Sequence, residues 1–176
     1  MKLFLVWIQQ LLRKWLKPDL IVKSIFEINY DELMDRGLTN LFFDVDNTLT
    51  ERSKSVPEWK VKKLLRELKE RGFSVYLVSN STKLKRMIKI VSFLECRMTL
   101  QSMKPLPFVY RKLRKETGAS PANSVFIGDQ LFTDILGARL NRFLAIYTYP
   151  SGQELSTLRR FYIATEKWIL ERALVS

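Results

Sequence analysis

Short apolar runs alternate with amphipathic helical segments along most of this chain of 176 residues. An apolar run bounded by turn residues is typical of a strand that is buried on both faces of a sheet. Strands that alternate with helices form a parallel sheet, because the chain has to cross back over the sheet between two parallel strands. The alternation predicts an α/β fold of three layers, with a Rossmann-like parallel sheet between two layers of helices. Ligands of such sheets bind beyond the carboxyl ends of the strands.

The same pattern predicts where the elements and domains lie. We expect strands at residues 24–28, 41–45, 73–78, 96–100, 124–127 and 143–147, and helices at residues 30–36, 57–71, 83–94, 106–117, 131–140 and 154–174. The composition gives no sign of a second core. The chain therefore divides into an N-terminal segment (1–17), one α/β domain (18–150) and a helical tail packed on that domain (151–176).

The N-terminal segment, residues 1–17, predicts a basic amphipathic helix. Its apolar side carries Trp7 and Trp15, and its polar side carries Arg13, Lys14 and Lys17. The apolar stretch is too short to span a bilayer, but the combination suits a helix lying on a membrane surface. Packing of this helix on the protein's own core, or on a partner protein, is the alternative.

Composition narrows the chemistry. The chain has 30 Lys and Arg against 18 Asp and Glu, a net charge of +12, which favours an anionic partner such as a membrane face or a nucleic acid. It has no histidine, which excludes mechanisms that need an imidazole. Its one cysteine, Cys96, suits a reducing compartment, and a thiol phosphatase is excluded because Ser102 stands where that chemistry needs an arginine.

Polar residues gather where four of the expected strands end. They are Asp44 and Asp46, Ser79 and Asn80, Lys104, and Asp129 with Asp134. A single aspartate after a strand is usually a helix cap, but capping does not explain four such strand ends. Of two carboxylates two residues apart, Asp44 and Asp46, one can attack phosphorus while the other transfers protons. Asp44 and Asp129 offer the hard oxygen ligands that Mg²⁺ prefers, and Ser79 and Lys104 can grip phosphate oxygens.

Four motifs in this order resemble those of the haloacid dehalogenase superfamily. They are DVDNTLT at residues 44–50, Ser79 after YLV, Lys104, and GDQLFTD at residues 128–134. The resemblance implies that Asp44 is the nucleophile and a magnesium ligand. It implies that Asp46 is the general acid and base, with its backbone carbonyl on the metal.

The resemblance also assigns the remaining site residues. Ser79, Asn80 and Lys104 would bind the phosphate, although Asn80 could instead only fix its loop. Asp129 would complete the magnesium ligands, and Asp134 would hold Lys104 from behind. The carboxylate at Asp46 suits water as the final acceptor of the phosphoryl group.

The chain leaves little room for a cap domain. Only 32 residues separate Asp46 from Ser79, and 24 separate Ser79 from Lys104. With LFTDILGA extending the fourth motif and Lys17-Pro-Asp-Leu at the start of the domain, the chain resembles the capless phosphatidylglycerophosphate phosphatases of bacteria and mitochondria. That resemblance implies an anionic phospholipid substrate and a cytoplasmic enzyme, peripheral on the inner face of the membrane.

Two other readings of the sequence stay open. One is a nucleic-acid end phosphatase or a phosphoprotein phosphatase of the same superfamily. We expect no nucleic-acid partner, because aromatic residues are not interleaved with the basic ones. The other is a non-catalytic interaction module, which the complete set of carboxylates disfavours. The sequence leaves the oligomeric state open.

Overall fold

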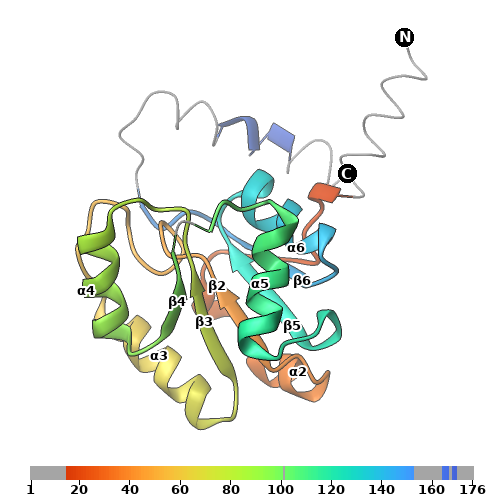
Figure 1. Cartoon of the computed structure of the whole chain (residues 1–176), viewed down its shortest axis with the longest axis horizontal. Coiled ribbons are helices and arrows are strands. Elements are labelled where there is room, and N and C mark those ends of the chain that lie inside the picture. The colour runs from red at the N-terminus through yellow and green to blue at the C-terminus, as the bar shows by residue number, and fades with distance from the viewer. Residues whose placement is uncertain (1–14, 101, 153–163, 167, 170–176) are drawn as a thin grey trace.

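A six-stranded, fully parallel sheet forms the centre of the computed structural model, which describes residues 15–100, 102–152, 164–166 and 168–169 (Figure 1). The strand order is β1-β6-β5-β2-β3-β4. The bounds are β1 Leu20–Val22, β2 Asn40–Phe43, β3 Ser74–Val78, β4 Arg97–Thr99, β5 Ser124–Gly128 and β6 Leu144–Thr148. The predicted α/β class with a Rossmann-like parallel sheet is confirmed.

Helices cover both faces of the sheet (Figure 1). One face packs against α2 Tyr30–Asp35, α3 Trp59–Glu70 and α4 Leu84–Leu94, and the other packs against α5 Pro107–Thr117 and α6 Leu136–Leu140. Successive residues of a strand point to opposite faces, so Leu41 and Phe43 join the first core and Phe42 joins the second. Both faces are buried, which is why the strands read as continuous apolar runs.

The predicted strand at residues 24–28 is wrong. The first strand is Leu20–Val22, and Ile25–Glu27 forms a 3-10 helix, η1. Ile25 and Ile28 lie three residues apart and are both buried, a spacing that suits a helical turn rather than a pleated strand. Residues 131–140 are helical as predicted, but they begin as a π-helix, η3 Leu131–Ile135, before α6. A second 3-10 helix, η2 Pro121–Asn123, precedes β5.

The two ends of the chain are described only in part. Most of the predicted amphipathic helix 1–17 lies outside the described residues, but Trp15 and Leu16 are helical and Leu16 is buried in the core beside α5 and α6. Much of the predicted tail 151–176 also lies outside them. Its described residues at 164–166 and 168–169 are helical, and Glu166 and Ile169 are buried. Among the described residues, no helix has the length and apolarity needed to cross a membrane.

The register of the central strands positions the site. Phe43 of β2 is paired with Leu77 of β3 on one side and with Ile127 of β5 on the other. The residues that follow these three strands therefore leave the sheet at the same edge, its carboxyl edge. They include Asp44, Ser79 and Asp129.

Candidate active site

The loop after β2 turns sharply and keeps two aspartates at the carboxyl edge. The Asp44 amide donates to the Ile127 carbonyl at 2.8 Å, which extends the pairing of β2 and β5 by one residue. Asn47 adopts a left-handed conformation, with φ 68°, which asparagine tolerates better than most residues. Its amide donates to the Thr50 carbonyl at 2.7 Å, and its side chain accepts from the Arg52 amide at 3.2 Å. Asn47 therefore shapes the loop that carries Asp44 and Asp46.

A buried lysine joins two aspartates at the centre of the site. Lys104 Nζ lies 2.6 Å from Asp44 Oδ1 and 2.7 Å from Asp134 Oδ1. It also donates to the Val78 carbonyl at 3.1 Å. These three acceptors satisfy the three protons of the ammonium group. The side chains are at most 4% exposed, so this charge cluster is excluded from bulk water.

Burial changes the protonation of this cluster. Burial raises the pKa of the Asp44 carboxyl from its ordinary 3.8 to about 7; Lys104 opposes the rise, and the charges of Asp134 and Asp46 add to it. Burial disfavours the Lys104 ammonium, but the carboxylates of Asp134 and Asp44 outweigh it and raise the pKa of Lys104 above its ordinary value. Lys104 is therefore a fixed positive charge, and Asp44 needs more positive charge nearby to be fully ionised at neutral pH.

Asp129 and Asp134 come from the segment after β5. One oxygen from each of Asp44, Asp129 and Asp134 can be chosen so that all three lie within 4.8 Å of one another. Asp134 is held in place, because its Oδ1 contacts Lys104 and its Oδ2 accepts from the Gln130 amide at 3.1 Å. Gly128 makes room for it, since a Cβ at this position would lie 2.3 Å from Asp134 Oδ2.

Asn80 joins the two loops that carry the second and third motifs. Its Oδ1 accepts from the Lys104 amide at 2.9 Å and from Ser102 Oγ at 2.8 Å, and its Nδ2 donates to the Lys104 carbonyl at 3.1 Å. These bonds fix the backbone that carries Lys104. The structure thus gives Asn80 the loop-fixing contacts that were the alternative to phosphate binding.

The two serines after β3, Ser79 and Ser81, differ in their access to the site. Ser79 is buried, and its Oγ accepts from the Ser81 amide at 3.0 Å. Ser81, which the motif does not single out, lies on the wall of a cavity of about 200 Å³. The other residues of that wall are Asp44, Asp46, Arg52, Asn80, Lys104 and Gln130. Phosphate binding by Ser79 stays a prediction.

Arg86 of α4 is a site residue that the sequence analysis missed. Its Nη1 donates to Asp46 Oδ1 at 2.6 Å, its Nε to the Lys54 carbonyl at 2.8 Å and its Nη2 to the Glu51 carbonyl at 3.1 Å. The Arg86 side chain is only 11% exposed. In the sequence Arg86 stands among lysines on a basic helix and looks like part of a solvated face. The only feature of the sequence that could have pointed to Arg86 is its position six residues after Asn80, at the start of the helix that follows the second motif.

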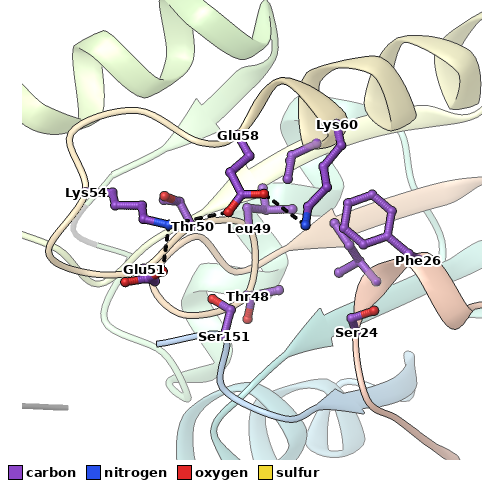
Figure 2. Close-up of a pocket in the computed structure, with 12 residues that line it drawn as sticks. Ser24, Phe26, Thr48, Leu49, Thr50, Glu51, Lys54, Glu58, Lys60 and Ser151 are labelled. Carbon is purple, nitrogen blue, oxygen red and sulfur yellow. Dashed lines mark hydrogen bonds and ion pairs between the residues drawn. The ribbon is translucent and has the colours of Figure 1, made fainter. Parts of the chain in front are cut away.

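A second cavity, of about 220 Å³, lies on the other side of the first-motif loop. Figure 2 shows Lys54 between Glu51 and Glu58, and Lys60 next to Glu58. The lysine charges here are compensated by glutamates, so an anion gains little from them. The cavity lined by Asp44, Asp46 and Lys104 is the better candidate for phosphate chemistry.

The sequence matches known proteins over most of its length. Residues 7–140 match the family of haloacid dehalogenase-like hydrolases. A Bacillus subtilis protein named probable phosphatase YqeG is 30% identical over 161 residues, which are 91% of this chain and 92% of that protein. An Arabidopsis thaliana protein named phosphatidylglycerophosphate phosphatase 1, chloroplastic/mitochondrial, is 27% identical over 175 residues, or 93% of this chain and 48% of that protein.

Two solved structures share the fold. An uncharacterized protein from Listeria monocytogenes serotype 4b has a TM-score of 0.52 and 16% identity, over 76% of this chain and 98% of that chain. A hypothetical protein from Xanthomonas campestris has a TM-score of 0.54 and 20% identity, over 77% and 78%. The match of residues 7–140, together with the four strand ends converging on one cavity, shows that this chain belongs to the haloacid dehalogenase-like hydrolase family.

Proposed function

We propose that this protein is a magnesium-dependent phosphomonoesterase that forms a phospho-aspartate on Asp44. The observation that carries the proposal is the Asp44 carboxylate itself. Lys104 holds its Oδ1, whereas its Oδ2 is buried and has no hydrogen-bond partner among the described residues. A buried carboxylate oxygen without a partner is costly, and Asp44 lines a cavity together with Lys104 and Asp46.

The residues present fit a magnesium ion. Carboxylate oxygens are hard ligands of the kind that Mg²⁺ prefers, and Asp44 and Asp129 would hold it together with the backbone carbonyl of Asp46. Both oxygens of Asp134 already contact protein donors, so Asp134 positions Lys104 and the loop after β5. When bound, the ion would neutralise repulsion between the Asp44 carboxylate and a phosphate dianion. Its charge would also favour the ionised Asp44 that burial disfavours.

The reaction takes two steps on the protein's own groups. In the first, an Asp44 oxygen forms a bond to phosphorus while the ester P–O bond breaks, and Asp46 donates its proton to the departing oxygen. In the second, water attacks the phosphorus of the phospho-aspartate, and Asp46 accepts the proton of that water. Inorganic phosphate leaves and the Asp44 carboxylate is regenerated, which is the pattern of covalent catalysis with one group acting as acid and then base.

Arg86 has the contacts to position Asp46 for both steps. Its guanidinium holds one oxygen of the Asp46 carboxylate and two carbonyls of the loop that follows. The second Asp46 oxygen is then left for the leaving group and for water. A lysine could supply the charge but not this fixed set of three donors.

The proposed substrate is phosphatidylglycerophosphate. The Arabidopsis relative carries that activity in its name, and this chain matches 48% of its length. The described chain has only loops and α3 between β2 and β3, so it has few groups with which to enclose a small leaving group. A membrane that holds both enzyme and substrate supplies a high local concentration instead.

Phosphate release from a panel of substrates tests this function. We expect the highest kcat/KM for phosphatidylglycerophosphate in mixed micelles, compared with glycerol 3-phosphate, a nucleoside monophosphate, a phosphopeptide and a 3′-phosphorylated oligonucleotide. Asp44→Asn should abolish release from every substrate while thermal unfolding stays close to wild type. A folded Asp44→Asn protein with normal turnover would contradict the mechanism, and a wide margin for the oligonucleotide would contradict the lipid substrate.

A further inference from the structure

The cavity mouth is bordered by two loops that are bound to each other. The loop at residues 79–83 contributes Asn80 and Ser81 to the cavity wall, and the loop at residues 102–106 contributes Lys104. Asn80 joins them through its bonds to the Lys104 backbone. The first loop leads directly into α4 and the second into α5. The first turns of both helices therefore flank the mouth at the carboxyl edge of the sheet.

Large apolar side chains are exposed on the second of these loops and on the helices that follow the two loops. We call the set the cavity rim: Leu84, Ile88, Met103, Leu106 and Phe108, which are 42–57% exposed. They are five of the twelve large apolar side chains that are exposed within the described part of the chain, and all five fall within 25 consecutive residues. Single exposed apolar residues need no explanation, but a group beside a binding cavity indicates an interaction surface.

The same stretch of chain is strongly basic. Residues 72–115 carry ten Lys and Arg and a single acid, Glu95. Glu95 lies at the far end of α4, where it pairs with Lys62. Just before α4 and along its first half, Lys83, Lys85 and Lys89 are exposed alongside Leu84 and Ile88. Apolar side chains with lysines beside them form the pattern of a helix that lies on an anionic bilayer.

We infer that the cavity rim and the exposed lysines of α4 dock the enzyme on an anionic lipid bilayer, with the cavity mouth facing the headgroups. This inference rests on the proposed function, since it places a lipid phosphomonoester at Asp44. A nucleic acid would attract the same lysines, but it gains affinity from aromatic side chains that stack on bases. Only one of the five rim residues, Phe108, is aromatic, so the rim fits lipid better.

This surface is separate from the described end of the predicted amphipathic helix, residues 15–17. Trp15 lines a cavity together with Arg142 and Phe143. These two residues directly precede β6, so this cavity is at the amino edge of the sheet. The cavity rim lies at the carboxyl edge. Docking through the rim brings Asp44 to the lipid phosphates directly, which an attachment at the amino edge does not.

Vesicle sedimentation of the full chain tests the inference. The variants are Lys85→Glu with Lys89→Glu, and Ile88→Ser with Phe108→Ser. The control for charge is Arg36→Glu with Arg142→Glu at the amino edge, which changes net charge by the same amount. The control for apolar groups is Leu20→Ser with Leu140→Ser, whose side chains are 41–42% exposed, against 46–54% for Ile88 and Phe108. The vesicles are phosphatidylcholine with and without phosphatidylglycerol. Hydrolysis of soluble p-nitrophenyl phosphate is measured in parallel.

We expect the charge variant to bind the anionic vesicles at least about thirtyfold more weakly than wild type. The apolar variant should bind several-fold more weakly, and both controls should bind as wild type. Soluble hydrolysis should be unchanged in all four. Wild-type vesicle binding by both the charge variant and the apolar variant would overturn the inference. If, in addition, the charge variant released phosphate more slowly from the 3′-phosphorylated oligonucleotide, the surface would be assigned to nucleic acid. If the wild type does not hydrolyse soluble p-nitrophenyl phosphate, the proposed function is refuted, whereas the result for vesicle binding still stands.

Discussion

At the scale of single residues, the site depends on how each charge is held by its neighbours. Lys104 has an acceptor for each of its three protons. Arg86 divides its donors between Asp46 and two carbonyls. Both cations lie against a carboxylate that we assign to the reaction. Substitutions at such positions should therefore change the chemistry more than the affinity for phosphate.

Arg86→Ala should affect substrates according to their leaving groups. Without Arg86, Asp46 loses its orientation, so turnover of an alkyl phosphate, which needs a proton on the leaving oxygen, should fall about tenfold or more. Turnover of p-nitrophenyl phosphate, whose leaving group departs without a proton, should fall much less. The measurement is the turnover rate for a series of phosphomonoesters whose leaving groups increase in pKa. The slope of log kcat against the leaving-group pKa should become steeper in Arg86→Ala.

Two further variants show whether a change in that slope comes from Asp46. Asp46→Asn should steepen it in the same way, and Lys89→Ala, an exposed cation on the same helix, should leave it unchanged. An equal loss for all leaving groups in Arg86→Ala would mean that Arg86 only supports the loop. A flat slope in Asp46→Asn would refute the proton transfer assigned to Asp46.

Cys96 should be a slow thiol. Burial raises its pKa, which Lys69 only partly opposes, so less of the reactive thiolate is present at a given pH than for an ordinary cysteine. Alkylation by iodoacetamide at pH 8 should be slower in the native protein than in the same protein unfolded in urea. The rate should keep rising with pH beyond the ordinary range of a cysteine. Equal rates for native and unfolded protein would show that Cys96 is accessible.

At the scale of elements, the sequence predicts well wherever both faces of an element are buried. The central strands β2, β3 and β5 were expected because buried strands are continuous apolar runs, and glycine marks the ends of three helices. The edge strand β1 was misplaced because its three residues go from exposed to buried without alternation. The strand was instead predicted at residues 24–28, where Ile25 of η1 and its C-cap Ile28 are buried three residues apart, a spacing that suits a helical turn.

The sequence also predicts the part of the site that follows from the fold class, but not the part that depends on how the helices pack. The strand-end residues Asp44, Lys104, Asp129 and Asp134 do converge, because the fold class alone places the ends of parallel strands together. The contact of Arg86 with Asp46, 40 residues away in sequence, depends on how α4 packs against the sheet. No local pattern carries that information. The π-helical turn that presents Asp134 is equally invisible in the spacing of apolar residues.

The junction of β5 and the π-helix offers a test at this scale. Gly128→Ala would place a Cβ 2.3 Å from Asp134 Oδ2, and Asp134 cannot yield easily because it is fully buried and hydrogen-bonded. We expect a loss of about 1–3 kcal/mol in the free energy of unfolding. In an Asp134→Ala background, Gly128→Ala should lower the free energy of unfolding clearly less, because the carboxyl group that its Cβ would clash with is absent. Urea denaturation of the four proteins measures the cycle, and additive costs would show that the contact is not the cause.

At the scale of the whole molecule, metal binding should stabilise the fold. The ligand oxygens that we assign to magnesium, those of Asp44 and Asp129, come within 4.8 Å of each other only when the chain is folded. A cation that binds them binds only the folded chain. Magnesium at about a hundredfold excess over its Kd should raise Tm by about 5–10 °C. Calorimetry with magnesium, with chelator and with sodium chloride of equal ionic strength measures the shift.

The same metal should control activity. Chelator should abolish phosphate release, magnesium should restore it, and calcium should not, because calcium favours more ligands and looser geometry. Asp129→Asn should reduce both the rise in Tm and the activity. Full activity after exhaustive chelation would contradict the ligand roles of Asp44 and Asp129.

The chain joins the sheet at the edge opposite the cavity, since Trp15 and Leu16 lie beside the residues that precede β6. An attachment to lipid made there would limit the distance between enzyme and bilayer but not the direction in which the cavity points. Molecules held only at that edge would be bound and idle. The enzyme on a membrane would then partition between an idle and a productive orientation. Its specific activity per bound molecule would rise with the anionic lipid fraction even after binding is saturated.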